Sequence, residues 1–142
     1  MNKTVSILLR FSLGFIFLWA FLDKTFGLGF ATPSSNSWIN GGSPTSGFLS
    51  YAVKGPFASF FQSLSGNNFV DLIFMAGLLF IGLTLILNRF VVWGSVAGLL
   101  MVVLMYLAVL PPENNPVIDD HIIYAILFAH FIILNRKKES SI

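Results

Sequence analysis

Three acids and a histidine are concentrated in one polar segment between two apolar stretches of the chain. They are Glu113, Asp119, Asp120 and His121. A histidine changes its charge near neutral pH and can donate or accept a proton, and a neighbouring carboxylate can orient it. We therefore expect His121 to be a proton donor or acceptor, with Asp119 or Asp120 beside it. The alternative is a solvated rim in which both aspartates only stabilise the N-terminus of the following helix.

Lys24 is the cation that a closed helix bundle would bring to this cluster. In an up-down-up-down bundle, the end of the first helix lies beside the start of the fourth. Lys24 would then pair with Asp119 or Asp120. The carboxylates disfavour an anionic ligand here unless they are neutralised.

Arg10 and His130 form a second candidate set, and both lie inside apolar segments. Arg10 is about five residues after the start of its segment and His130 is about four before the end of its own, which places them at similar depth. Ionisable side chains inside a membrane are candidate functional groups. The alternative is an arginine that extends its charge to the membrane surface and a histidine bonded within its own helix.

A glycine-rich loop supplies further candidates for ligand binding. They are Trp38, Asn40, Gly41, Gly42, Ser43 and Thr45. Successive backbone N–H groups in such a loop can bind an oxyanion. Loops of this composition are far more often plain turns.

No metal site is expected. His121 and His130 are nine residues apart, so on one helix they point about 180° from each other and cannot ligate one iron together. The absence of cysteine excludes disulfides, thiol redox chemistry, cysteine-ligated iron–sulfur clusters and covalent haem attachment. We therefore expect no bound metal, haem or iron–sulfur cluster.

The elements that must position these side chains follow from a composition typical of membrane proteins. Of the 142 residues, 56% are hydrophobic and 10% are charged, whereas a soluble domain is about 25% charged. The length suffices for about four spanning helices of ~20 residues, in a single domain over residues 1–142. The net charge of +2 is scattered and does not indicate nucleic acid. The expected partner is the lipid bilayer.

Four apolar runs divide the chain. The predicted spans cover residues 5–22, 69–87, 90–110 and 119–134. Asn67 or Asn68 can cap the second span, and Asp71 suits its positive N-terminal end. The short link Asn88-Arg89 forces the second and third spans into an antiparallel hairpin. The predicted fold class is an all-α integral membrane protein, an antiparallel bundle of four transmembrane helices.

A long loop over residues 25–68 connects the first two predicted spans. Phe57, Phe60, Phe61 and Leu64 recur at helical spacing after Pro56, which predicts a short amphipathic helix over residues 56–64. This helix either lies in the membrane interface or packs on the bundle as a lid.

Basic residues predict the orientation. One set falls at the ends of spans on the same side, namely Lys3, Arg89, Arg136, Lys137 and Lys138. Only Lys24 and Lys54 fall on the other side. By the positive-inside rule, both termini are cytoplasmic, and residues 25–68 and 111–120 are extracytoplasmic. The expected location is the cell membrane, with the chain crossing it several times.

Several motifs together resemble a known family. The stretches are Asp23-Lys24-Thr25-Phe26-Gly27, Trp38-Ile39-Asn40-Gly41-Gly42-Ser43-Pro44-Thr45, Gly55-Pro56-Phe57 and Leu110-Pro111-Pro112-Glu113-Asn114-Asn115-Pro116, with Arg10 and Leu13-Gly14. Over nearly its whole length the chain resembles the DoxX-like family of small four-span membrane proteins, and most of all the DoxD-type subunit of thiosulfate:quinone oxidoreductase. The resemblance implies a link to quinone and sulfur redox chemistry, with no residue assignment to carry over.

Two functions follow as hypotheses. The first is a membrane subunit of a quinone-linked oxidoreductase that acts on a sulfur compound such as thiosulfate, with a second redox subunit or a homo-oligomer as partner. The second is a non-catalytic scaffold or anchor for a redox partner protein. In the first, a quinone headgroup or a sulfur oxyanion binds under the outer loop, between Lys24, the loop over residues 38–45 and the residues 119–121.

Overall fold

The computed structural model describes residues 2–113 and 115–139, and all of their regular secondary structure is helical. The long helices are α1 (Lys3–Phe26), α3 (Asn68–Ile86), α4 (Val91–Val109) and α5 (Asp120–Glu139). The short ones are η1 (Ser34–Asn36), η2 (Trp38–Asn40), the π-helical turn η3 (Phe48–Ala52) and α2 (Ala58–Gln62). The all-α prediction is confirmed.

Three of these helices are long and apolar enough to cross a membrane: α1, α3 and α4. They coincide with the first three predicted spans to within a few residues. Helix α5 covers the fourth predicted span but is not among the three, because its sequence is more polar. The described residues therefore establish a helical protein with three candidate spans, and the fourth span stays a prediction.

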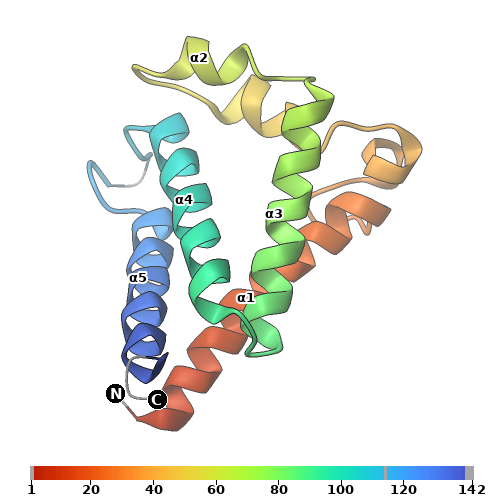
Figure 1. Ribbon diagram of the computed structural model, residues 1–142. Coiled ribbons are helices and arrows are strands. Elements are labelled where there is room, and N and C mark those ends of the chain that lie inside the picture. The colour runs from red at the N-terminus through yellow and green to blue at the C-terminus, as the bar shows by residue number, and fades with distance from the viewer. Residues whose placement is uncertain (1, 114, 140–142) are drawn as a thin grey trace.

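The hairpin of α3 and α4 is confirmed. Helix α3 ends at Ile86 and α4 begins at Val91, so the tight link holds the two helices antiparallel (Figure 1). Asn88 and Phe90 in the link both adopt a φ of 55°, and the N–H of Arg89 donates to the carbonyl of Thr84 at 3.2 Å. At the other end, Asn67 is the one of the two predicted caps that caps α3, because its side chain accepts from the N–H groups of Phe69 and Val70.

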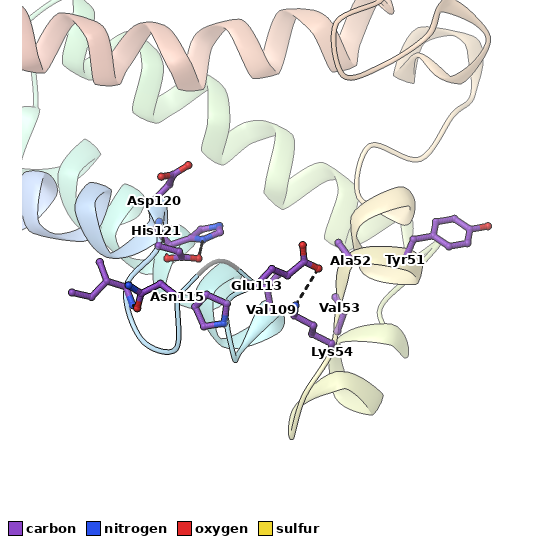
Figure 2. Close-up of a pocket in the computed structure, with 12 residues that line it drawn as sticks. Tyr51, Ala52, Val53, Lys54, Val109, Glu113, Asn115, Asp120 and His121 are labelled. Carbon is purple, nitrogen blue, oxygen red and sulfur yellow. Dashed lines mark hydrogen bonds and ion pairs between the residues drawn. The ribbon is translucent and has the colours of Figure 1, made fainter.

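The four long helices are not arranged as a closed square. Helix α1 packs mainly on α3, α3 on α4, and α4 on α5, with a smaller contact between α1 and α5. In Figure 1 the C-terminal end of α1 and the start of α5 lie on opposite sides of α3 and α4. The segment with η3 and α2 crosses the open end of the α3–α4 hairpin and approaches the turn between α4 and α5 (Figures 1 and 2).

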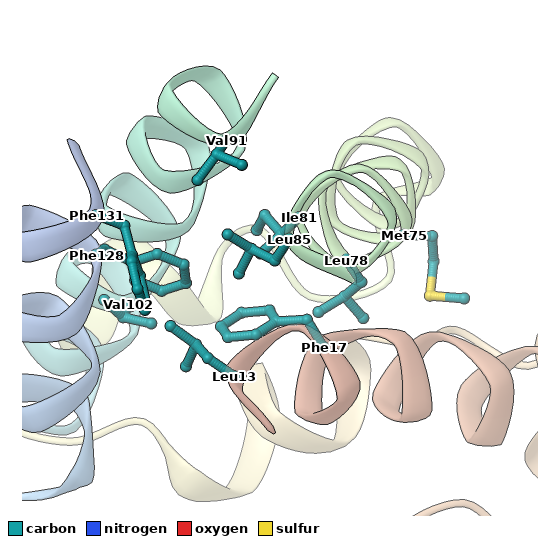
Figure 3. Packing of buried hydrophobic residues seen from close by; sticks show 10 residues of the cluster. All are labelled: Leu13, Phe17, Met75, Leu78, Ile81, Leu85, Val91, Val102, Phe128 and Phe131. Atoms are coloured by element: carbon teal, nitrogen blue, oxygen red, sulfur yellow. The ribbon is translucent and has the colours of Figure 1, made fainter. Parts of the chain in front are cut away.

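The core lies where the four long helices converge (Figure 3). Its buried members are Leu13, Phe17, Met75, Leu78, Ile81, Leu85, Val91, Val102, Phe128 and Phe131. Phe17 of α1 and Phe128 of α5 meet edge to face, with ring centroids 5.5 Å apart. Two glycines allow the close approach of the helices. A Cβ at Gly82 would lie 2.8 Å from the backbone of Leu18, and one at Gly98 would lie 2.2 Å from the ring of Phe128.

Candidate functional site

A buried carboxylate in the first turn of α3 holds the glycine-rich loop. Asp71 is only 3% exposed, and one of its oxygens accepts hydrogen bonds from the hydroxyl of Ser43 at 3.0 Å, the hydroxyl of Thr45 at 2.6 Å and the N–H of Thr45 at 3.1 Å. The donors that we expected to bind an oxyanion are thus used by a carboxylate of the chain itself. From the sequence, Asp71 suggested only a favourable charge at a helix end.

A second buried carboxylate, at the end of α1, holds the start of the same segment. Asp23 is 2% exposed, and its two oxygens accept from the N–H groups of Phe30 at 3.2 Å and Ala31 at 2.9 Å. Asp23 and Asp71 together fasten the chain between α1 and η3. An acid at the end of an apolar helix, followed by a glycine- and serine-rich segment, was the available signal for such an anchor.

The remaining loop candidates are engaged in turns. The side chain of Asn40 donates to the carbonyl of Ser34 at 2.9 Å, and the N–H groups of Gly41 and Gly42 donate to carbonyls of residues 38 and 37. Trp38 is partly buried and packs against the core. These bonds favour the plain-turn interpretation over an oxyanion cradle.

A polar cleft gathers the predicted acids and the histidine. It has a volume of about 530 Å³ and lies between the end of η3, the end of α4 and the first turn of α5 (Figure 2). Its charged lining residues are Lys54, Glu113, Asp119, Asp120 and His121. The structure therefore brings together four of the predicted site residues, and it adds Lys54, which the sequence analysis had not placed there.

Asp119 and His121 form a bonded pair in this cleft. The Nδ1 atom of His121 lies 2.7 Å from Oδ2 of Asp119, and both side chains are 21% exposed. Oδ1 of Asp119 accepts from the N–H of His121 at 3.0 Å, so this residue also caps the first turn of α5. When Nδ1 carries the proton, Nε2 is a free acceptor. Asp120 points away from the pair (Figure 2).

Lys54 and Glu113 form a more exposed ion pair across the cleft, with 3.2 Å between Nζ and Oε1. Such pairs contribute about 0–1 kcal/mol. The backbone makes the firmer connection, since the N–H of Lys54 donates to the carbonyl of Ala108 at 3.0 Å. Gly55 then passes so close to Leu110 that a Cβ would lie 1.8 Å from its carbonyl oxygen.

A second cavity, of about 460 Å³, lies between α3 and α4. Its walls are largely apolar, and they include Val70, Ile73, Phe74 and Gly77 of α3 and Ala97, Leu100, Met101, Leu104, Met105 and Ala108 of α4. Residues of the segment 44–64 form its roof, and Lys24 is the one charged residue among the described residues that line it. We call it the apolar cavity.

The roof contains the predicted amphipathic helix. Phe61 of α2 is buried in a small core with Leu49, Val53 and Ala108, whereas Phe57 and Phe60 are exposed. Helix α2 therefore packs against α4 and η3 as a lid. It is shorter than predicted, because residues 63–66 form turns.

The single outer site that we expected is divided between the two cavities. Lys24 lines the apolar cavity and His121 lines the polar cleft. In the part of the chain that the structure describes, the ion pairs are Lys54–Glu113 and Asp119–His121, so Lys24 does not pair with Asp119 or Asp120. The reason is geometric, because the C-terminal end of α1 diverges from α5 (Figure 1).

The two ionisable residues inside the helices are also separate. Arg10 donates from Nη1 to the carbonyl of Leu85. This carbonyl belongs to the last turn of α3, so no N–H group of the same helix is available to bond to it. Arg10 was grouped with His130 of the fourth predicted span, but its partner lies in α3. The Nε2 atom of His130 and the hydroxyl of Ser95 are buried and have no hydrogen-bond partner among the described residues.

Metal ligation finds no support in the described residues, where no group of three or more histidine, aspartate and glutamate side chains could hold an ion. No family model, curated protein or solved structure matches the chain.

Proposed function

We propose that this chain is a membrane subunit of a quinone-linked oxidoreductase acting on a sulfur compound such as thiosulfate, and that the quinone binds in the apolar cavity. The observation that carries the proposal is the cavity itself, about 460 Å³ of mostly apolar space with Lys24 as its charged residue. The link to sulfur chemistry rests on the resemblance to the DoxX-like family.

The cavity suits an amphipathic ring with an apolar tail. Ligand sites commonly have volumes of about 300–1,000 Å³, with apolar walls and a few polar groups that orient the ligand. The ammonium group of Lys24 can donate to a quinone carbonyl oxygen. It also stabilises the negative charge that develops on that oxygen during reduction, more strongly than it would in water.

Reduction of a quinone to a quinol takes up two electrons and two protons. The electrons come from oxidation of the sulfur compound, with the second redox subunit on the outer face. His121, oriented by Asp119, supplies protons from the polar cleft. The two cavities adjoin the same end of α4, where Ala108 lines one and its neighbour Val109 lines the other.

The sulfur oxyanion belongs outside the polar cleft. Three carboxylates line the cleft, from Glu113, Asp119 and Asp120, against the single ammonium group of Lys54. The negative charge of these carboxylates would repel an anion. We therefore place its oxidation on the partner subunit.

The proposed topology has four spans with α5 as the last, both termini in the cytoplasm, and the segment 27–67 and the turn before α5 on the outer side of the cell membrane. The 20 residues of α5 extend about 30 Å, which is enough to cross the hydrocarbon core. The asymmetry of basic residues supports the orientation.

The test is quinone binding by the purified protein in lipid nanodiscs. We expect quinone to be retained through purification, and Lys24→Ala to weaken binding about tenfold, which corresponds to the loss of one charge-assisted hydrogen bond. Lys54→Ala is the matched control, because Lys54 lies outside the apolar cavity, and it should bind within about twofold of the parent. If the parent neither retains nor binds quinone, the scaffold function takes the place of this one.

A further inference from the structure

Residue 77, at the end of the apolar cavity away from Lys24, has no side chain, and the methyl group of Met101 lies beside it. A Cβ at Gly77 would lie 2.6 Å from Cε of Met101, and this is its one close contact among the described residues. Gly77, Met101 and Ala97 all line the cavity. A larger residue at position 77 would occupy the space between α3 and α4.

The cavity is elongated along the two helices. Its lining extends on α3 from Val70 to Gly77 and on α4 from Ala97 to Ala108, which corresponds to about 10 Å and about 16 Å of helix. The two polar lining residues, Lys24 and Thr45, come from the end of α1 and from the roof. The other end is apolar, and beyond it the fully buried Ile81 closes the core.

We propose that Gly77, Ala97 and Met101 form a subsite for the apolar chain of the ligand, and that Gly77 and Met101 determine how long a chain the protein accepts. The inference rests on the proposed function insofar as that chain is the tail of a quinone. The subsite offers only small or apolar side chains, so it selects hydrocarbon and excludes polar substituents.

Met101 makes the length limit adjustable. A methionine side chain has three rotatable bonds and no branch, and its thioether adapts to irregular neighbours. Its terminal methyl lies 2.6 Å from the position that a Cβ at residue 77 would take. A change of its rotamer would therefore alter the space beside Gly77.

The experiment compares affinity against chain length in Gly77→Leu and in the parent. The probes are quinones with no tail, one isoprene unit and two isoprene units, and in parallel straight-chain fatty acids of increasing length. Ala76→Leu is the matched control, because Ala76 is the preceding residue on α3, is exposed and does not line the cavity.

We expect the affinity of the parent to rise about three- to fourfold for each added methylene that is buried. In Gly77→Leu this rise should disappear, while the tail-less quinone binds within about twofold of the parent. Ala76→Leu should behave as the parent does. Adding Met101→Ala to Gly77→Leu should restore part of the dependence, because it removes the side chain that the leucine meets.

Each outcome has a distinct meaning. An unchanged dependence on chain length in Gly77→Leu overturns the subsite and leaves quinone binding intact. If fatty acids alone show the dependence, and Gly77→Leu abolishes it, the subsite holds a lipid chain and the quinone function fails. If neither series binds the parent, both proposals fail. Should Gly77→Leu not fold, Gly77→Ala and Met101→Phe fill the same space and test the same prediction.

Discussion

Arg10 in α1 donates a hydrogen bond to the backbone carbonyl of Leu85 in the last turn of α3. The bond places a positive charge where the carbonyl groups of a helix end concentrate negative charge. It also satisfies an acceptor that α3 cannot satisfy within itself. The arginine therefore joins two helices and does not only extend toward the membrane surface.

The first prediction concerns this bond. Arg10→Leu should lower the stability of the detergent-solubilised protein by about 1–3 kcal/mol, because the Leu85 carbonyl loses its partner. Thermal unfolding followed by circular dichroism measures the effect. Ser12→Leu is the control, since Ser12 is exposed on the same helix. A melting temperature for Arg10→Leu equal to that of the control would show that the bond contributes nothing.

The second prediction concerns the Asp71 anchor. Asp71→Ala removes the acceptor for two hydroxyl groups and one N–H, and should destabilise the protein by about 2 kcal/mol or more. Limited proteolysis should then cut the segment 27–47 faster than in the parent. Asp120→Ala, which changes an exposed aspartate at the start of another helix, should leave the cleavage rate unchanged. Equal cleavage of the two variants would exclude an anchoring role.

The third prediction compares two glycines with nearly the same positive φ. Gly55 and Gly66 have φ values of 77° and 75°, but only Gly55 faces another part of the chain, the carbonyl of Leu110. Gly66→Ala should cost about 1–2 kcal/mol, the usual cost of this conformation for a residue with a Cβ. Gly55→Ala should cost clearly more, because the roof must move away from α4. Chemical unfolding of the two variants measures both losses of stability. Equal losses would mean that the contact between Gly55 and Leu110 can be relieved at little cost.

The fourth prediction concerns the polar cleft and rests on the proposed function. With the redox partner present, His121→Ala should slow quinone reduction about 100-fold, the lower end of the usual contribution of a proton donor. Quinone affinity should not change, because His121 lies outside the apolar cavity. Asp119→Asn should slow the reaction less, and Asp120→Asn should have no effect. Rates equal to that of the parent in all three variants would make the cleft a solvated rim.

The fifth prediction concerns topology. The chain has no cysteine, so single cysteines can be placed at Ser35, Val117 and Ser140, of which Ser140 lies outside the described residues. An impermeant thiol reagent should label positions 35 and 117 from the outer side and position 140 only after the membrane is opened. Labelling of 117 and 140 from the same side would remove α5 from the set of spans.

Apolar runs were sufficient to predict the positions of the long helices, and the short link at Asn88 was sufficient to predict the hairpin. They could not predict the angle at which α1 crosses α3. That angle depends on the contact of Gly82 with the backbone of Leu18, and a glycine in an apolar helix does not reveal which neighbour it will meet. For this reason the predicted meeting of Lys24 with Asp119 does not occur.

The candidate site was predictable in part. Asp119 and His121 are two residues apart, so their pairing is local and sequence spacing anticipates it. The partners of Asp71 lie 26 and 28 residues away, across turns and two short helices whose path in space local sequence patterns do not predict. The apolar cavity arises from a roof and two helices, and no short motif encodes it.

The Asp71 anchor also has a consequence for how the protein is made. Thr45 leaves the ribosome 26 residues before Asp71, so the hydroxyl and amide donors are already synthesised when the carboxylate emerges. The partner of Arg10, the carbonyl of Leu85, follows soon afterwards. Helix α1, the segment up to Thr45 and α3 can therefore make these contacts before α4 emerges from the ribosome. The roof over residues 44–64 closes only afterwards, because Lys54 bonds to Ala108 and Gly55 lies against Leu110.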